Sequence, residues 1–187
     1  MNTKRASLFA CMGAFSAAIA AILPACSSID PDEVNNVTCP SGESFRAVSA
    51  VMERRCGTLD CHGHVARPLR IYGQYGLRRP EPSDSPNVND YAQYYPGGRE
   101  PTTQAELDDN LLSFCGLEPE IMTDVVNGDA EPDELVIVRK ARLEQKHKGG
   151  LIWFKGTEGD RCLTSWLDGS IAELGTGSCE DELTRNR

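Results

Sequence analysis

The sequence predicts a small, mainly α-helical single domain with long loops, stapled by disulfides. Apolar residues recur at helical spacing in several separate stretches, and residues typical of helix starts and ends flank these stretches. Proline-rich segments lie between them, with five prolines between residues 80 and 101. Six cysteines follow Cys26, an even number that permits complete disulfide pairing.

Helix signals define three helices in the first two thirds of the chain, over residues 41–55, 103–116 and 119–128. The first helix would lead directly into a pair of cysteines. The helix signals are a cap at Ser41, a capping box at Thr103 and Glu106, Pro119 at a helix start, and Gly116 and Gly128 at helix ends.

The last third of the chain is predicted with less regular structure. Residues 132–143 could begin as a helix and continue as extended chain, and residues 151–154 predict a short strand. Residues 160–167 predict a last helical turn or two. From Ser170 the chain is rich in glycine and acidic residues, which indicates a flexible tail held at most by Cys179. We expect three aromatic residues here to lie in the core, namely Trp153, Phe154 and Trp166.

The N-terminus predicts export. Lys4 and Arg5 precede an uncharged apolar stretch over residues 6–23, which is typical of a signal peptide. Leu23-Pro24-Ala25-Cys26 resembles the lipobox of bacterial lipoproteins, which implies that Cys26 is lipidated. Because serine follows this cysteine, we expect the lipoprotein to be sorted to the outer membrane, facing the periplasm or the cell surface. A plain secretory signal and an uncleaved anchor are the alternatives. The expected segments are a signal peptide over 1–25, a lipid-anchored tether over 26–40, a domain over 41–169 and a tail over 170–187.

Charge and cysteine content narrow the function classes. Without residues 1–25 the chain carries 17 basic and 28 acidic residues, a net charge of −11, and no basic patch is visible. We therefore expect no nucleic-acid partner. The six cysteines after Cys26 form either three disulfides or, if one pair holds another group, two. Sequence patterns for a Ser-His-Asp triad, HExxH or a phosphate-binding glycine loop are missing.

The most informative motif is Cys56-Gly-Thr-Leu-Asp-Cys61-His62. Two thiols followed by an imidazole are what a c-type haem requires, because the thiols form thioethers and the imidazole binds the iron. The usual spacing has two residues between the cysteines and this chain has four, so the motif is less specific. A local disulfide with His62 exposed beside it is the alternative. A further alternative is a zinc site formed by Cys56, Cys61, His62 and His64. Adjacent residues such as Cys61 and His62 rarely point at one tetrahedral centre, however.

Two stretches resemble monohaem c-type cytochrome domains of bacterial envelope proteins. They are a helix running into CGTLDCHG and the later stretch ELVIVRKARLEQKHKGG…LTSWLDG, over roughly residues 43–78 and 132–169. The resemblance implies a cytochrome c-like fold with one covalent haem c, bound by Cys56 and Cys61, with His62 as the proximal iron ligand. It also implies that a His-x-Gly-Gly element, here beginning at His147, and a C-terminal Trp helix close the domain.

The sixth iron position has two candidate ligands. His147 is the first and Met122 the second, and a Met/His pair would have a higher potential than a pair of histidines. His64 is too close in sequence to His62 to cross the haem plane. An open sixth position would indicate ligand binding or catalysis. Arg67 and Arg70 could pair with the haem propionates, or belong to a solvated basic strip.

These observations predict an exported lipoprotein that carries one covalent c-type haem and transfers electrons between envelope proteins. We expect an electron carrier rather than an enzyme, with a place in an oxidoreductase assembly left open. The alternative is a cofactor-free, disulfide-stapled surface lipoprotein that acts as a binding or structural module. The loop over residues 80–101 could dock a redox partner.

Overall fold

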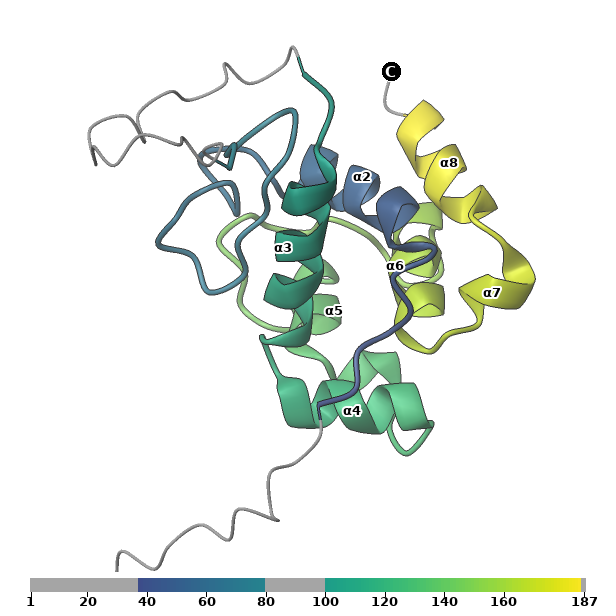
Figure 1. Ribbon diagram of the computed structural model, residues 1–187. Helices are drawn as coiled ribbons and strands as arrows, with labels where there is room; N and C mark the ends of the chain where they lie inside the picture. Colours follow the sequence, from purple (N-terminus) through teal and green to yellow (C-terminus); the bar gives the residue numbers. More distant parts are fainter. Residues whose placement is uncertain (1–36, 80–99, 186–187) are drawn as a thin grey trace, which may run out of the picture. The chain divides into compact units, whose positions relative to one another are not determined.

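The computed structural model describes residues 37–79 and 100–185 (Figure 1). Within these ranges the chain forms α-helices, one short 3-10 helix and no strand, which confirms the predicted mainly α class. The predicted signal peptide, Cys26, residues 26–36 of the tether and most of the 80–101 loop lie outside the described residues. The elements are α2 (Phe45–Arg55), α3 (Gln104–Cys115), α4 (Pro119–Asn127), η3 (Pro132–Glu134), α5 (Val136–Ala141), α6 (Glu158–Leu167), α7 (Ile171–Leu174) and α8 (Gly177–Arg185).

The predicted helix ends in the middle of the chain are confirmed. Thr103 and Glu106 form a capping box at the start of α3. Pro119 begins α4, and Gly128 ends it in the left-handed conformation, with φ of 81°. The first helix differs from the prediction, because α2 begins at Phe45 and the Ser41 hydroxyl instead accepts a hydrogen bond from the Glu43 N–H.

An aromatic cluster lies at the centre of the hydrophobic core. The Phe45 ring from α2 is 4.9 Å from the Trp166 ring of α6 and 5.6 Å from the Phe114 ring of α3, measured between centroids. Trp153 is also buried, and its Nε1 donates to the Glu182 carboxylate of α8. Phe154 is 69% exposed, so the prediction that it lies in the core is wrong. Trp153, the preceding residue, takes the inward position, where its Nε1 is hydrogen-bonded to Glu182.

Residues 132–154 also differ from the sequence prediction. The chain is helical in η3 and α5, with one extended residue, Leu135, between them, and α5 is not followed by the predicted extended stretch. Residues 151–154 form no strand, because Ile152 N–H and Trp153 N–H both donate to the Ala141 carbonyl at the end of α5. The helix end therefore provides the hydrogen-bond acceptor that a strand partner would have provided.

The segment predicted to be a flexible tail contains two helices, α7 and α8. α8 packs against α6 and α2 (Figure 1), and the disulfide Cys162–Cys179 joins it to α6. Cys179 and Glu182 are buried in α8 and Leu183 packs partly buried against the core, so the inward face of this helix has too few apolar residues to give a clear helical pattern in the sequence. The compact unit therefore extends beyond residue 169.

Two disulfides confirm the predicted stapling. Cys39 pairs with Cys115, and Cys162 pairs with Cys179. Cys56 and Cys61 are free. None of the described helices is long and apolar enough to cross a membrane.

Candidate functional site

The end of α2 fixes the position of the Cys56–His62 motif. Cys56 is the C-cap of this helix, and its N–H donates to the Met52 carbonyl at 2.8 Å. The following turn closes on itself, because the His62 N–H donates to the Cys56 carbonyl at 2.8 Å. A Cβ at Gly63 would lie 2.1 Å from the Gly57 carbonyl oxygen, so this tight turn requires glycine. The motif therefore leaves the helix as a compact loop that brings His62 back toward Cys56.

A backbone acceptor orients the His62 ring. Nδ1 lies 2.9 Å from the Leu69 carbonyl oxygen. Since a carbonyl can only accept, Nδ1 donates the proton and Nε2 keeps its lone pair. Burial lowers the pKa of His62, and the charges of His147, Arg67 and Lys140 lower it further, against the opposing effect of the Leu69 hydrogen bond. His62 is therefore a neutral imidazole at neutral pH, with Nε2 available as a ligand.

His147 is held in the same way by a second loop. Its Nδ1 lies 3.0 Å from the Gly150 carbonyl oxygen, which again leaves Nε2 with its lone pair. Gly150 has φ of 75°, a conformation that L side chains rarely adopt, and its N–H donates back to the His147 carbonyl. The His-x-Gly-Gly element is therefore a tight turn that anchors its own histidine.

The two loops bring the two histidines together. The ring centroids of His62 and His147 are 6.2 Å apart, and the ring planes differ by 27°. A metal ion bonds an imidazole nitrogen at about 2 Å, so two rings that bind one ion from opposite sides have centroids roughly 6 Å apart. The rings are stacked, and their separation would suit two imidazoles that hold one ion.

The two free cysteines differ in environment. Cys56 is 7% exposed and Cys61 is half-buried. Burial raises the pKa of the Cys56 thiol to about 12, and Cys61 adds to this effect while Arg55 opposes it. Cys56 is therefore a neutral thiol at neutral pH. The local disulfide considered from the sequence is not formed between these two residues.

The remaining candidate ligands lie in other environments. Met122 is 1% exposed and packs within the hydrophobic core. His64 is exposed, and its Nδ1 accepts a hydrogen bond from the Ala66 N–H at 3.2 Å. In residues 37–79 and 100–185, no group of three or more His, Cys, Asp or Glu side chains could hold a metal ion. The four residues considered for zinc therefore do not form such a site here.

The two arginines predicted to bind propionates have different surroundings. Arg67 is exposed, and its Nε donates to the Cys61 carbonyl at 3.0 Å. Arg70 is half-buried, with its guanidinium 5.3 Å from the centre of the Tyr72 ring. The Arg70 Nε is buried without a hydrogen-bond partner.

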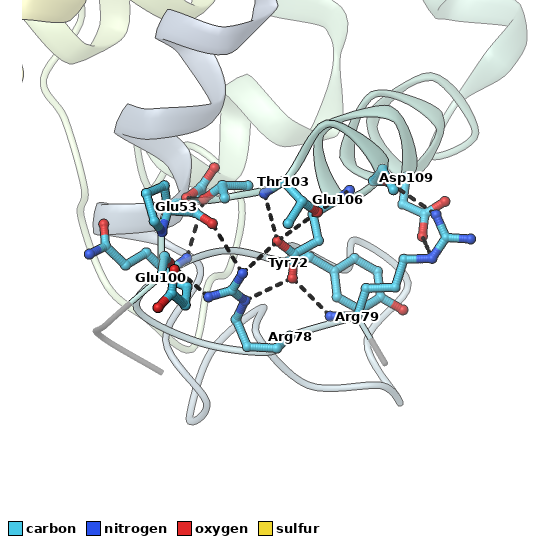
Figure 2. Close-up of polar contacts among 12 residues, drawn as sticks. Glu53, Tyr72, Arg78, Arg79, Glu100, Thr103, Glu106 and Asp109 are labelled. Carbon is cyan, nitrogen blue, oxygen red and sulfur yellow. Dashed lines mark hydrogen bonds and ion pairs between the residues drawn. The ribbon is translucent and has the colours of Figure 1, made fainter. Parts of the chain in front are cut away.

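A buried ion pair fastens the segment after the motif to α3 (Figure 2). Arg78 forms a two-point contact with the Glu106 carboxylate, at 2.8 and 3.0 Å, and both side chains are buried. Glu106 also accepts from the backbone N–H of Arg79 and of Thr103. Burial alone would raise the pKa of Glu106, but these hydrogen bonds and the Arg78 charge outweigh it and lower the pKa. The sequence revealed the capping box, but not this second use of Glu106.

A second buried ion pair closes the loop that carries His147. Arg142, directly after α5, contacts the Asp160 carboxylate of α6 at 2.6 and 3.1 Å. Asp160 also accepts from the Gly156 N–H at 2.7 Å, and Arg142 reaches Asp133 as well. Residues 143–156 are therefore held at both ends. The sequence analysis missed this pair, because nothing in the spacing of Arg142 and Asp160 marks them as partners.

Exposed apolar side chains occur on both histidine loops. Leu59 and Val65 are 62% and 61% exposed on the His62 loop, and Leu143 and Leu151 are 49% and 40% exposed on the His147 loop. Leu143 is the non-glycine residue with positive φ, at 58°, within the described residues. Both histidine loops therefore expose apolar side chains.

Comparisons with known proteins do not assign the chain to a family. The chain matches no protein-family model, no curated protein and no solved structure. The site residues themselves therefore carry the functional argument.

Proposed function

We propose that the protein is an exported electron carrier that binds one haem c covalently, with His62 and His147 as the two axial ligands. The paired histidines carry this proposal. Each ring is fixed through Nδ1 to a backbone carbonyl, each keeps its Nε2 lone pair, and the centroids are 6.2 Å apart. Ligating histidines in proteins are typically anchored through their other nitrogen in this way.

The surrounding residues fit a haem group. Cys56 and Cys61 are both free and lie in the loop that carries His62. Each thiol would add across one vinyl group, with the sulfur bonding the carbon next to the ring and the hydrogen going to the terminal carbon, so no oxidant is needed. The haem iron supplies reversible one-electron chemistry. The protein's residues would hold the group and orient both imidazoles.

Two histidine ligands favour a lower reduction potential than a histidine and a methionine. The environments of the two candidate distal ligands favour His147 over Met122. Met122 packs within the core, whereas the His147 ring is stacked with the His62 ring at 6.2 Å between centroids. The proposed carrier therefore accepts electrons from, and passes them to, envelope proteins of comparably low potential.

Export and a lipid anchor complete the proposal. Two disulfides are typical of proteins from oxidising compartments. The lipobox-like sequence ending at Cys26 supports attachment to the outer membrane through a lipidated Cys26. Mass spectrometry of the mature N-terminus would test this attachment, and an unmodified Cys26 would refute it.

Expression of the full chain with cytochrome c maturation proteins tests the haem proposal. We expect a Soret band, and haem that remains on the protein band in a denaturing gel. His147→Ala should abolish the low-spin spectrum. Met122→Leu, a buried substitution of similar volume, should preserve it and serves as the matched control. A colourless protein with Cys56 and Cys61 oxidised to a disulfide would refute the haem proposal and favour the cofactor-free binding module.

A further inference from the structure

Two arginines carry a buried guanidinium nitrogen without a hydrogen-bond partner. They are Arg70 and Arg139, and in each the atom is Nε. Among the described residues no other buried side-chain nitrogen or oxygen lacks a partner. Buried donors are nearly always satisfied in folded proteins, so these two Nε atoms point to an acceptor that the polypeptide itself does not supply.

Each of these arginines lies on one of the two segments that carry the histidines. Arg70 directly follows Leu69, whose carbonyl binds the His62 ring. Arg139 is in α5, and its carbonyl accepts the N–H groups of Glu144 and Gln145 at the start of the His147 loop. Each arginine therefore belongs to a segment whose backbone helps to position one of the two histidine loops.

We infer that Arg70 and Arg139 each bind one carboxylate of the ligand held between His62 and His147. This inference rests on the proposed function, in which the two carboxylates are the haem propionates. A guanidinium presents two parallel N–H donors that match a carboxylate, and it stays charged at all relevant pH values. The Tyr72 ring, 5.3 Å from the Arg70 guanidinium, supports that side chain in the absence of an acceptor.

Two arginines that follow the Cys56–His62 motif differ from Arg70 and Arg139, because their guanidinium groups already have partners within the protein. Arg67 already donates from Nε to the Cys61 carbonyl and is exposed. Arg78 is committed to the buried pair with Glu106. The sequence suggested Arg67 and Arg70 as a pair, whereas the structure favours Arg70 and Arg139.

The reduction potential of the haem-loaded protein tests this inference. We compare wild type with Arg70→Met and Arg139→Met, and use Arg161→Met, an exposed arginine of α6 paired with Glu158, as the control. Removing a positive charge beside a propionate disfavours the reduced state, so both variants should shift to lower potential. The potential should also depend more strongly on pH, because the pKa of a propionate without its arginine rises. Arg161→Met should change neither quantity.

A conservative variant separates charge from geometry. Arg139→Lys keeps the charge and loses the two-point contact, so it should restore part of the potential and part of the pH profile, and it replaces Arg139→Met if that variant does not fold. A low-spin protein whose potential and pH profile match wild type in both methionine variants would overturn this inference and leave the haem proposal intact. A shift in only one variant would overturn the assignment of two carboxylates. A wild-type protein without a Soret band would overturn both.

Discussion

The rings of His62 and His147 are stacked with centroids 6.2 Å apart, although the two residues are 85 positions apart in the sequence. Neither ring is positioned by the other. The Leu69 carbonyl fixes His62, and the Gly150 carbonyl fixes His147. The pair therefore depends on two loops that are anchored separately, and each anchor can be tested by substitution.

The first prediction concerns the anchor of the His147 loop. Asp160→Asn leaves the buried Arg142 with a neutral partner, and removing one charge of a buried pair typically costs about 3–5 kcal/mol of the free energy of unfolding. We expect the lower end, about 3 kcal/mol, because Arg142 keeps its contact with Asp133. Urea denaturation measures this loss.

The control for Asp160→Asn is Glu158→Gln, which removes the ion pair with Arg161 at the start of the same helix. The Arg161 side chain is 54% exposed, so the loss should be below about 1 kcal/mol. Equal losses in the two variants would contradict the role assigned to Asp160.

The second prediction concerns the pH dependence of stability through Glu106. Its pKa in the folded protein lies below the ordinary 4.5, because hydrogen bonds from Arg78, Thr103 and Arg79 outweigh burial. Its contribution is therefore complete above the unfolded pKa and is lost as pH falls through the folded pKa. Glu106→Gln should be less stable at neutral pH and should lose stability less steeply on acidification. Urea denaturation between about pH 3 and pH 7 tests both effects.

Glu53 provides a comparison of opposite sign. Burial raises the pKa of this carboxyl group, although Thr102 and Ser49 donate hydrogen bonds to it. Its contribution is present at low pH and is lost as pH rises through its folded pKa. Glu53→Gln should therefore remove the decline in stability that Glu53 causes as pH rises from its unfolded pKa to its higher folded pKa. If the two substitutions changed the pH dependence of the free energy of unfolding in the same direction, the opposite pKa shifts assigned to Glu106 and Glu53 would be contradicted.

Local signals in the sequence were enough for part of the fold. The capping box of α3 and the glycine after α4 are encoded within a few residues, and the structure confirms both. α8 could not be found in this way, because a disulfide and Glu182 hold it rather than an apolar stripe.

The candidate site, like the fold, could be predicted from the sequence only in part. His62 and His147 were singled out from short motifs, and the structure places them together. Their anchors could not be predicted, since the Leu69 and Gly150 acceptors are backbone carbonyls that any residue would provide. The pairing of Arg142 with Asp160 depends on how α5 and α6 pack, which residue spacing does not encode.

The third prediction concerns the two free thiols in the protein without haem. Cys56 is 7% exposed with a pKa of about 12, whereas Cys61 is half-buried. The thiolate is the nucleophile, so iodoacetamide should modify Cys61 first. Peptide mass spectrometry at increasing times measures the order. Both residues should react at similar rates in denaturant, and faster modification of Cys56 in the folded protein would contradict the buried position of its thiol.

The last prediction concerns Leu143, which begins the His147 loop with φ of 58°. A left-handed conformation typically costs a residue with a Cβ about 1–2 kcal/mol, and glycine avoids this cost. Leu143→Gly and Leu143→Ala remove the same exposed apolar side chain, but alanine retains the strain. Glycine pays instead with the greater chain entropy that it loses on folding, about 0.5–1 kcal/mol relative to alanine. We therefore expect Leu143→Gly to exceed Leu143→Ala in free energy of unfolding by about 0.5–1 kcal/mol, measured by urea denaturation. An alanine variant as stable as the glycine variant would show that the loop does not hold this residue in the left-handed conformation.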